Sequence, residues 1–348
     1  MSGAMLAGLI TGANQLELRE FPTPTPADNG VVVDIAYCGI CGTDVHAFAS
    51  GRSYRPAICG HEWTGTISAT GKAVTARREG DRVVVGVPAP CGSCAACRGG
   101  HPLHCMTCVA FVHGRDPGAP LHGGFAPQLA VSVDRVIAAH PRLSDEVLAQ
   151  VEPVTVSLHA VNRSGLREGD TAVVLGAGPV GLTTMQCALA AGAGQVLVVE
   201  PSGVRRAVAV ALGATAVATP EAAADLTAER TNGLGADVVY DCVGGGEALS
   251  TAVDLARRGG SVCMIGLADG SASITPGTWL RKEITVVAAL GYVHHEFETA
   301  MEMLAEGRIR VDTLHTSTTG LQGLADALND LASGSSVQLK VLVRPTWK

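Results

Sequence analysis

Four cysteines in the first third of the chain have the spacing of a metal site. Cys91, Cys94, Cys97 and Cys105 form a C-x2-C-x2-C-x7-C pattern in a stretch rich in Gly, Ser and Ala. Thiolates this close converge on one tetrahedral ion, and four sulfur ligands leave no position open for water or substrate. The pattern therefore predicts a structural zinc site. An iron–sulfur cluster, which also uses four cysteines, is the alternative, and Cys108 is interpreted as a spare thiol.

A second set of candidate ligands lies upstream of these cysteines. Cys41 lies in the segment CGICGTDVH, and His61 lies in the segment GHE. A catalytic zinc takes three protein ligands and keeps one position open, and mixed Cys, His and carboxylate ligands suit it. Cys41 and His61 are therefore the best candidates. Cys38 and Cys59 are interpreted as packed thiols, because a free cysteine is most often a small buried hydrophobe.

A glycine-rich turn indicates a dinucleotide site. It follows the apolar run 171–175 and begins a predicted helix over 179–191. Glycines in such a turn let the backbone approach a pyrophosphate and let the helix pack closely on the strand, while the helix N-terminus faces the negative charge. The residues expected to bind the cofactor here are Gly176, Gly178, Pro179, Val180 and Gly181.

An acidic residue after the next apolar run bears on the choice of cofactor. Glu200 ends the run 195–199, about 20 residues after the turn. A carboxylate there accepts hydrogen bonds from the ribose hydroxyls and repels a 2′-phosphate, which favours NAD over NADP. The alternative is an acidic residue that merely begins a turn before Pro201. Arg205 and Arg206 complicate the choice, because either could reach a 2′-phosphate.

Two kinds of sequence must position these residues. Up to about residue 151, short apolar runs alternate with turn residues, as in an antiparallel β domain. From Gly169 onward, apolar runs alternate with Ala- and Leu-rich helical stretches, which is the βαβ pattern of a parallel sheet. The chain then leaves this unit through predicted helices over 297–306 and 320–333 and a strand over 339–343. We expect a catalytic domain over 1–155, a Rossmann domain over 156–292 and a return to the catalytic domain over 293–348.

The composition limits the classes of protein. The 348 residues carry a net charge of −7, and 47% of them are hydrophobic, so cores form easily and the basic face of a nucleic-acid binder is missing. No apolar stretch reaches the about 18 residues that a membrane span needs. Residues 1–12 lack the basic flank of an export signal and are predicted to form a strand. We therefore expect a cytoplasmic protein without nucleic acid or membrane among its partners.

Together these motifs resemble the zinc-containing medium-chain alcohol dehydrogenase family. The likeness rests on Gly-Ile-Cys-Gly-Thr-Asp, on Gly-His-Glu, on the four-cysteine segment and on the glycine turn, and it covers essentially the whole chain. It implies an α/β fold in which a GroES-like, β-rich catalytic domain carries an inserted Rossmann domain with a doubly wound parallel sheet. It also implies a catalytic and a structural zinc in each chain and a nicotinamide cofactor.

The resemblance assigns roles to individual residues. It makes Cys41, His61 and Glu152 the ligands of the catalytic zinc, with Glu62 able to replace water or enter the shell. Glu152, in a Glu-Pro pair, resembles the polyol, butanediol and threonine dehydrogenase branch, which implies a polyol or another secondary alcohol as substrate. A helix N-terminal charge is the alternative for Glu152. Lys340 matches the family's basic residue at the pyrophosphate, and a surface lysine is its alternative.

The implied reaction is hydride transfer between a small alcohol and NAD. Zinc polarises the alcohol oxygen, so that an alkoxide forms near neutral pH and the hydride can pass to the nicotinamide. Thr43 is expected to accept the alcohol proton and to relay it through the ribose hydroxyl to His46. Asp44 is expected to orient His61 through its second ring nitrogen.

Two other classes of function stay open at this point. A zinc-silent reductase or a nucleotide-binding protein could use the same fold, although the set Cys41, Thr43, His46 and His61 argues against it. A zinc-ribbon interaction module could be built on 91–105, although the acidic charge balance argues against a nucleic-acid partner. The family also implies a homodimer or homotetramer, because its edge strand, here 284–288, pairs across a two-fold axis.

Overall fold

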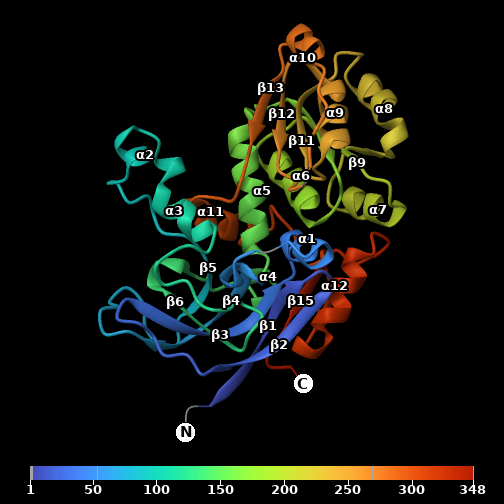
Figure 1. Ribbon diagram of the computed structural model, residues 1–348. Coiled ribbons are helices and arrows are strands. Elements are labelled where there is room, and N and C mark those ends of the chain that lie inside the picture. The colour runs from blue at the N-terminus through green and yellow to red at the C-terminus, as the bar shows by residue number, and fades with distance from the viewer. Residues whose placement is uncertain (1–2, 53, 269, 348) are drawn as a thin grey trace. The chain divides into compact units, whose positions relative to one another are not determined.

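The computed structural model describes residues 3–52, 54–268 and 270–347, and the chain divides into two compact units. Unit 1 contains Met1–Glu152, Val293–Ala305 and Leu314–Lys348, and unit 2 contains Pro153–Tyr292 and Glu306–Thr313. The blue N-terminal and red C-terminal strands in Figure 1 therefore belong to the same unit. Unit 2 comes mainly from one continuous stretch in the middle of the chain.

Unit 1 is built on a mostly antiparallel sheet. Its strands are β1 (Ala4–Gly12), β2 (Gln15–Pro22), β3 (Gly30–Gly39), β4 (Glu62–Thr70), β5 (Arg82–Val85), β6 (Gln128–Ser132), β7 (Val136–Ala138), β14 (His315–Thr319) and β15 (Lys340–Val343). The sheet order is β14-β15-β3-β4-β5-β7, β6 pairs with β3, and β1 and β2 form a separate ribbon. Among these pairs, β14 and β15 run parallel and the rest antiparallel.

The core of unit 1 lies against β3. Val31, Val33 and Ile35 alternate along this strand and are buried, because side chains two residues apart point to the same face. Trp63 and Phe125 complete the same apolar cluster. This packing fixes the ends of β3 and β4, which are the places where the candidate ligands occur.

The helices of unit 1 are short. They are α1 (Gly42–Ser50), α2 (Ala95–Arg98), α3 (Met106–Val112), α4 (Asp145–Leu148), α11 (His294–Ala305) and α12 (Leu324–Ala332), with 3-10 turns η1 (Pro56–Ile58), η2 (Pro102–His104), η3 (Val133–Arg135) and η5 (Leu321–Gly323). α11 begins before the predicted residue 297, because the Glu296 carboxylate accepts the Val293 N–H and stabilises its first turn. The predicted helix over 320–333 begins as η5 before it continues as α12.

Unit 2 holds a fully parallel sheet. Its strands are β8 (Thr171–Leu175), β9 (Gln195–Val199), β10 (Ala216–Ala218), β11 (Ala236–Asp241), β12 (Ala256–Met264) and β13 (Thr285–Ala288), in the order β10-β9-β8-β11-β12-β13. Every neighbouring pair is parallel, and the strand order reverses between β8 and β11. This is the doubly wound Rossmann arrangement, so the predicted fold class is confirmed.

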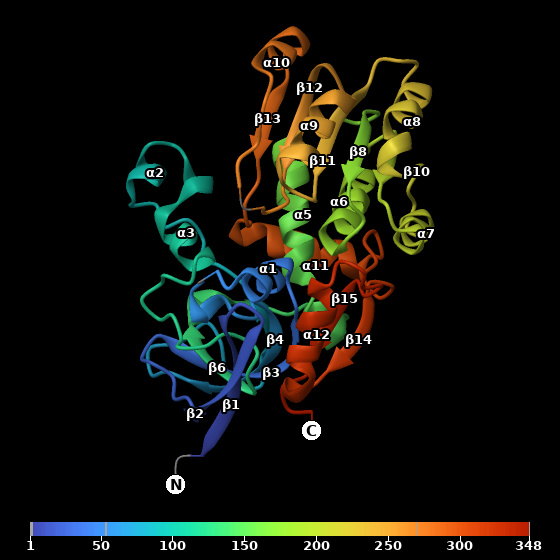
Figure 2. The same ribbon diagram turned by 45° about the vertical axis from the view of Figure 1, so that its right-hand side comes forward.

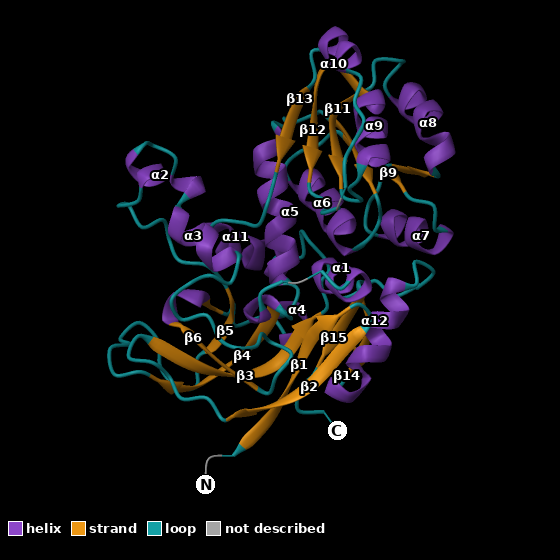
Figure 3. Ribbon diagram, in the orientation of Figure 1, coloured by secondary structure: helices purple, strands orange, loops and turns teal. Residues whose placement is uncertain are grey.

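Helices accompany the strands of this sheet. They are α6 (Pro179–Ala190), α7 (Gly203–Ala211), α8 (Ala223–Arg230), α9 (Gly246–Leu255) and α10 (Pro276–Lys282), with the 3-10 turn η4 (Pro220–Ala222), while α5 (Val151–Ser164) begins at the end of unit 1 and continues into unit 2. Figures 2 and 3 show the strands as a layer with helices beside it. None of the helices in the described part of the chain has both the length and the apolar composition needed to cross a membrane.

Candidate active site and metal centres

The register of the unit 1 sheet brings two candidate zinc ligands together. Gly39 pairs with Glu62 where β3 ends and β4 begins, so Cys41 and His61 follow and precede these strands at the same place. The Cys41 sulfur is the N-cap acceptor of α1 and receives the Thr43 N–H at 3.5 Å. The Cys41 thiol also raises the pKa of His61. The predicted pair is therefore close in space.

Negative charge surrounds His61. Burial lowers the pKa of His61, but the Cys41 thiol and the carboxylates of Asp44 and Glu152 outweigh it and raise this pKa well above its ordinary value. Such surroundings favour a positive charge at the ring. Thiolate, imidazole and carboxylate ligands are also a donor set that catalytic zinc accepts. Cys41, His61 and Glu152 therefore have the ligand types that suit a zinc ion, but their ligand atoms do not all lie within 4.8 Å of one another. Glu152 is buried in the first turn of α5.

The His61 ring has a different partner from the one predicted. Its Nδ1 lies 2.8 Å from the Ile58 carbonyl oxygen. Asp44 accepts three other hydrogen bonds, from the Cys41 N–H at 3.0 Å, the Gly60 N–H at 3.1 Å and the Tyr54 hydroxyl at 2.7 Å. The prediction for Asp44 is thus corrected: this buried carboxylate ties together the backbone segments that carry Cys41 and His61, and the Ile58 carbonyl orients the ring.

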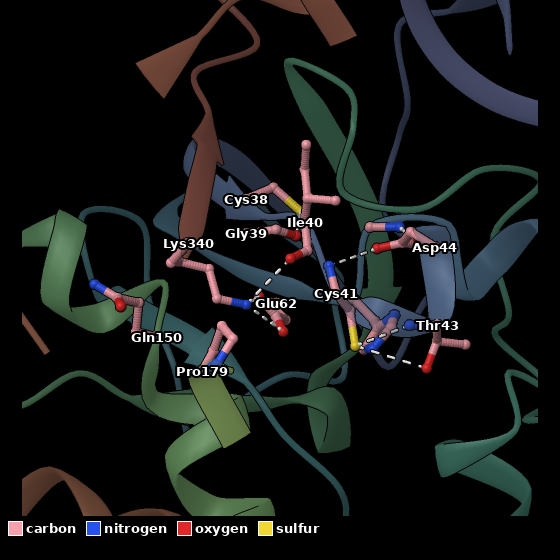
Figure 4. A network of polar contacts seen from close by, with 12 residues as sticks. Cys38, Gly39, Ile40, Cys41, Thr43, Asp44, Glu62, Gln150, Pro179 and Lys340 are labelled. Carbon is pink, nitrogen blue, oxygen red and sulfur yellow. Dashed lines mark hydrogen bonds and ion pairs between the residues drawn. The ribbon is translucent and has the colours of Figure 1, made fainter. Parts of the chain in front are cut away.

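Lys340 lies beside this cluster, as Figure 4 shows. Its Nζ is 2.6 and 2.9 Å from the two carboxylate oxygens of Glu62 and 3.1 Å from the Ile40 carbonyl oxygen. The two side chains are 3% and 1% exposed. An ammonium has three N–H donors, and each has an acceptor here. The alternative of a surface lysine is therefore wrong, and Glu62 is engaged by Lys340.

The first helix of unit 1 presents the predicted relay residues. Thr43 is half-buried, and its hydroxyl lies 3.6 Å from the Cys41 sulfur. His46 follows three residues later and is exposed. Residues three apart on a helix are neighbours on its surface. Thr43 therefore lies next to the Cys41 sulfur, and His46 lies at the solvent-exposed surface of the same helix.

The four-cysteine segment closes into a compact group. The sulfurs of Cys91, Cys94, Cys97 and Cys105 all lie within 4.8 Å of one another, the one such set of three or more potential ligands in the described ranges. A tetrahedral zinc with Zn–S bonds of about 2.3 Å needs sulfurs about 3.8 Å apart. The Cys94 and Cys105 sulfurs are 4.0 Å apart. The hydroxyl and N–H of Ser93 lower the pKa of Cys91 to about 5. The group therefore fits a four-thiolate zinc.

The glycine turn in unit 2 is shaped by close contacts. Gly176 has φ 91°, a conformation that favours glycine. A Cβ on Gly181 would lie 2.0 Å from the Gly176 carbonyl oxygen, so no larger residue fits where α6 packs on β8. A Cβ on Gly178 would meet nothing within 4 Å. Gly176 and Gly181 thus lie in close contact, and the space beside Gly178 is open. A pyrophosphate that approaches the backbone requires both features.

Glu200 stabilises that turn. Its two carboxylate oxygens accept the Ala177 N–H at 2.8 Å and the Ser202 N–H at 2.9 Å. Arg206 donates to the carbonyl oxygens of Glu200 and Pro201 at 2.6 and 2.7 Å. The carboxylate therefore links the turn to the start of α7, a structural role that the sequence did not indicate.

Known proteins match both units of the chain. Residues 27–141 match the alcohol dehydrogenase GroES-like domain, and residues 179–306 match the zinc-binding dehydrogenase domain. The sorbitol dehydrogenase of Bacillus subtilis is 30% identical over 349 residues, which cover 98% of this chain and 97% of that protein. The chain belongs to the zinc-containing alcohol dehydrogenase family.

Solved structures of this dehydrogenase family agree over the full length. The 2R,3R-butanediol dehydrogenase of Bacillus subtilis is 28% identical, with a TM-score of 0.83 over 98% of this chain and 100% of that chain. A zinc-binding dehydrogenase from Sinorhizobium meliloti, bound to NADP, has the same identity and TM-score over 99% of this chain and 100% of that chain. The chain is thus an oxidoreductase of alcohols that uses zinc and a nicotinamide cofactor. The predicted family and activity are confirmed.

The ion pair of this dehydrogenase was missed by the sequence reasoning. One signal was present: Lys340 interrupts the apolar run 339–343, and a charged residue inside a strand of that kind indicates a buried partner. The partner, Glu62, was not evident because it lies 278 residues away in the sequence. Tyr54, which donates to Asp44, was missed as well, because it lies ten residues away in the sequence.

Proposed function

We propose that this dehydrogenase oxidises a polyol or another secondary alcohol with NAD at the cluster of Cys41, His61 and Glu152. The observation that carries the proposal is the register of β3 and β4, which brings Cys41 and His61 to the same end of these strands, with Thr43 beside Cys41. Cys41, His61 and Glu152 would hold a zinc ion there, which would supply Lewis-acid polarisation of an alcohol oxygen, and a bound nicotinamide would supply the hydride acceptor. The branch is supported by relatives named for sorbitol and for butanediol.

Thr43 and His46 are the proposed proton carriers. The Thr43 hydroxyl lies next to the Cys41 sulfur, so an alcohol that approaches this cluster meets an oxygen able to accept its proton. His46 lies on the same helix and is in contact with solvent. A solvent-exposed histidine can therefore be the last carrier of the proposed relay.

Glu62 and Lys340 have proposed roles that require their ion pair to open. Glu62 would enter the zinc shell, and Lys340 would bind the cofactor pyrophosphate. In the pair, all three donors of Lys340 have acceptors, so either role costs at least one of these hydrogen bonds. The pair is therefore the resting arrangement, and it keeps the Glu62 carboxylate directed at the ammonium.

NAD is the proposed cofactor, bound by Gly176, Gly178, Pro179, Val180 and Gly181. Glu200 supports this choice, because its buried carboxylate at the end of β9 places a negative charge where a 2′-phosphate would otherwise be accepted. The N–H of Arg205 donates to the Ser202 hydroxyl, which caps α7. Arg206 is engaged by two backbone carbonyls, which favours a structural role over recognition of a 2′-phosphate.

The proposed assembly is a homodimer or a homotetramer, and the proposed location is the cytoplasm. β13 is the edge of the parallel sheet, and its residues are exposed or half-buried. An open edge of this kind pairs readily with a second copy. The eleven cysteines are all free, which suits a reducing compartment.

Metal analysis combined with a substrate panel tests this function. Sorbitol, butanediol, simple secondary alcohols and 3-hydroxy amino acids are assayed with NAD and with NADP. Cys41→Ala is expected to lose one equivalent of zinc and nearly all turnover, while Cys263→Ala, a buried thiol in β12, keeps both. Full zinc and full turnover in Cys41→Ala would contradict the proposed site, and activity confined to primary alcohols would contradict the substrate class.

A further inference from the structure

A fifth thiol lies next to the four-cysteine group. Cys108 is in the first turn of α3, which begins directly after Cys105, and its side chain is nearly buried at 5% exposure. Its sulfur lies close enough to interact with the sulfurs of Cys105 and Cys97. Its S–H donates to the Pro88 carbonyl oxygen at 3.1 Å. Cys108 therefore borders two members of the group without being one of the four that close together.

The members of the group differ in their contact with solvent. Cys91 is exposed, Cys94 and Cys97 are half-buried, and Cys105 is fully buried. Oxidation and alkylation of thiols follow exposure, so Cys91 is the ligand most open to attack. Cys108, in contrast to Cys91, is buried, as is Cys105. Loss of Cys91 would thus leave three ligands and a fourth thiol nearby.

We propose that Cys108 is a reserve ligand that holds the structural zinc when Cys91 is lost. The inference rests on a zinc ion in this segment, which the grouping of the four sulfurs within 4.8 Å of one another supports. In the exchange the Zn–S bond to Cys91 breaks and a Zn–S bond to Cys108 forms. The Cys108 thiol releases its proton to water and gives up its hydrogen bond to Pro88, and the replaced or alkylated Cys91 side chain takes up no proton. Four thiolates surround the ion before and after, and nothing is oxidised or reduced.

The spacing along the chain supports this exchange. Cys94, Cys97 and Cys105 are common to both ligand sets, so the zinc needs to change one bond only. The new set contains Cys105 and Cys108, separated by two residues, and pairs of cysteines with that separation commonly hold one zinc ion. Thr107 and Met106, the residues between them, lie in α3, whose first turn directs the Cys108 side chain back towards Cys105.

The test compares Cys91→Ala, Cys108→Ala and the double variant. Zinc per chain is measured by mass spectrometry after dialysis against a chelator, and the cobalt-substituted proteins are compared by their thiolate-to-metal absorption. Both single variants are expected to keep the full zinc content and a four-thiolate spectrum, whereas the double variant loses one equivalent. The matched control is Cys91→Ala/Cys187→Ala, which removes a buried thiol of unit 2 instead and should keep the zinc.

The outcomes separate this inference from the assignment of the zinc itself. A Cys91→Ala variant that loses zinc as completely as the double variant, or that shows a three-thiolate spectrum, overturns the reserve ligand. Loss of zinc from Cys108→Ala alone also overturns it, because Cys108 would then be a regular ligand. A wild-type chain with no zinc in this segment contradicts the four-cysteine site instead. Iodoacetamide gives a second readout: alkylation of Cys91 should release zinc from Cys108→Ala and not from the wild type.

Discussion

The ammonium of Lys340 lies 2.6 Å from the Glu62 carboxylate, and both side chains are buried. Sheet register explains the contact, because Gly39 of β3 pairs with Glu62 of β4 on one side and with Leu342 of β15 on the other. Burial lowers the pKa of Lys340, but Glu62 and Cys41 outweigh it and raise this pKa above its ordinary value. The ion pair therefore joins three strands next to the candidate zinc ligands.

Removal of one partner of this pair should be costly. Lys340→Met leaves the Glu62 carboxylate buried without its cation, and such unpaired buried charges cost about 3–5 kcal/mol of unfolding free energy. Denaturant unfolding of the purified protein measures the loss. Glu62→Gln/Lys340→Met should cost less than Lys340→Met alone. The exposed pair of Arg308 and Glu306 provides the control, and Arg308→Met should cost less than about 1 kcal/mol. Equal effects of Lys340→Met and Arg308→Met would show that the buried pair is not stabilising.

Two glycines of the nucleotide turn should respond differently to alanine. Gly181→Ala places a Cβ 2.0 Å from the Gly176 carbonyl oxygen and should destabilise unit 2 by about 3 kcal/mol. Gly178→Ala meets no protein atom within 4 Å, so it should cost only about 1 kcal/mol, through the weaker N-cap, but should lower NAD affinity at least about tenfold. Thermal unfolding and cofactor titration separate the effects. Unchanged NAD affinity in Gly178→Ala would count against pyrophosphate binding at this turn.

The sequence predicted the elements whose residue pattern is typical of a single local structure. β8 and β9 match their predicted ranges because strands of a buried parallel sheet are short apolar runs between glycines. The four-cysteine group was predicted because its ligands are close in sequence. The partner of Lys340 and the acceptors around Asp44 were not predicted, since they depend on strand register and on which backbone N–H groups a buried carboxylate meets. These are tertiary facts that no local pattern encodes.

Glu200 should control cofactor choice and also hold the turn. Glu200→Gln removes the charge and leaves one amide oxygen for the two N–H donors of Ala177 and Ser202. Hydrogen bonds to charged groups contribute about 1.5–3 kcal/mol, so kcat/KM for NAD should fall about 10- to 100-fold. The ratio of kcat/KM for NADP to that for NAD should rise, because the repulsion of the 2′-phosphate is gone. A ratio that stays constant would assign Glu200 to the turn alone.

Thr43 should be needed for turnover and not for folding. Thr43→Val keeps the shape of the side chain and the N–H that donates to Cys41, but it removes the hydroxyl. Loss of a positioned proton acceptor lowers kcat about 10²- to 10⁴-fold. Thr43→Ser retains the hydroxyl and should keep most of the activity, and the zinc content and melting temperature of both variants should match the wild type. If Thr43→Val turns over as fast as Thr43→Ser, the threonine is a turn residue and the relay begins elsewhere.

His122 should make unit 1 less stable in acid. Burial lowers the pKa of His122 below its ordinary value of 6.5, although the Gly123 carbonyl beside Nδ1 raises it in part. Because the folded-state pKa is the lower one, the stability that the neutral ring permits is fully present above pH 6.5. It is lost as the pH falls from there through the folded-state pKa, where the unfolded chain binds a proton that the folded chain does not. The loss is at most about 1.4 kcal/mol per pH unit. Urea unfolding from pH 7.5 to 5 should therefore show a steeper decline for the wild type than for His122→Gln, and two parallel curves would mean that His122 does not contribute to the acid sensitivity.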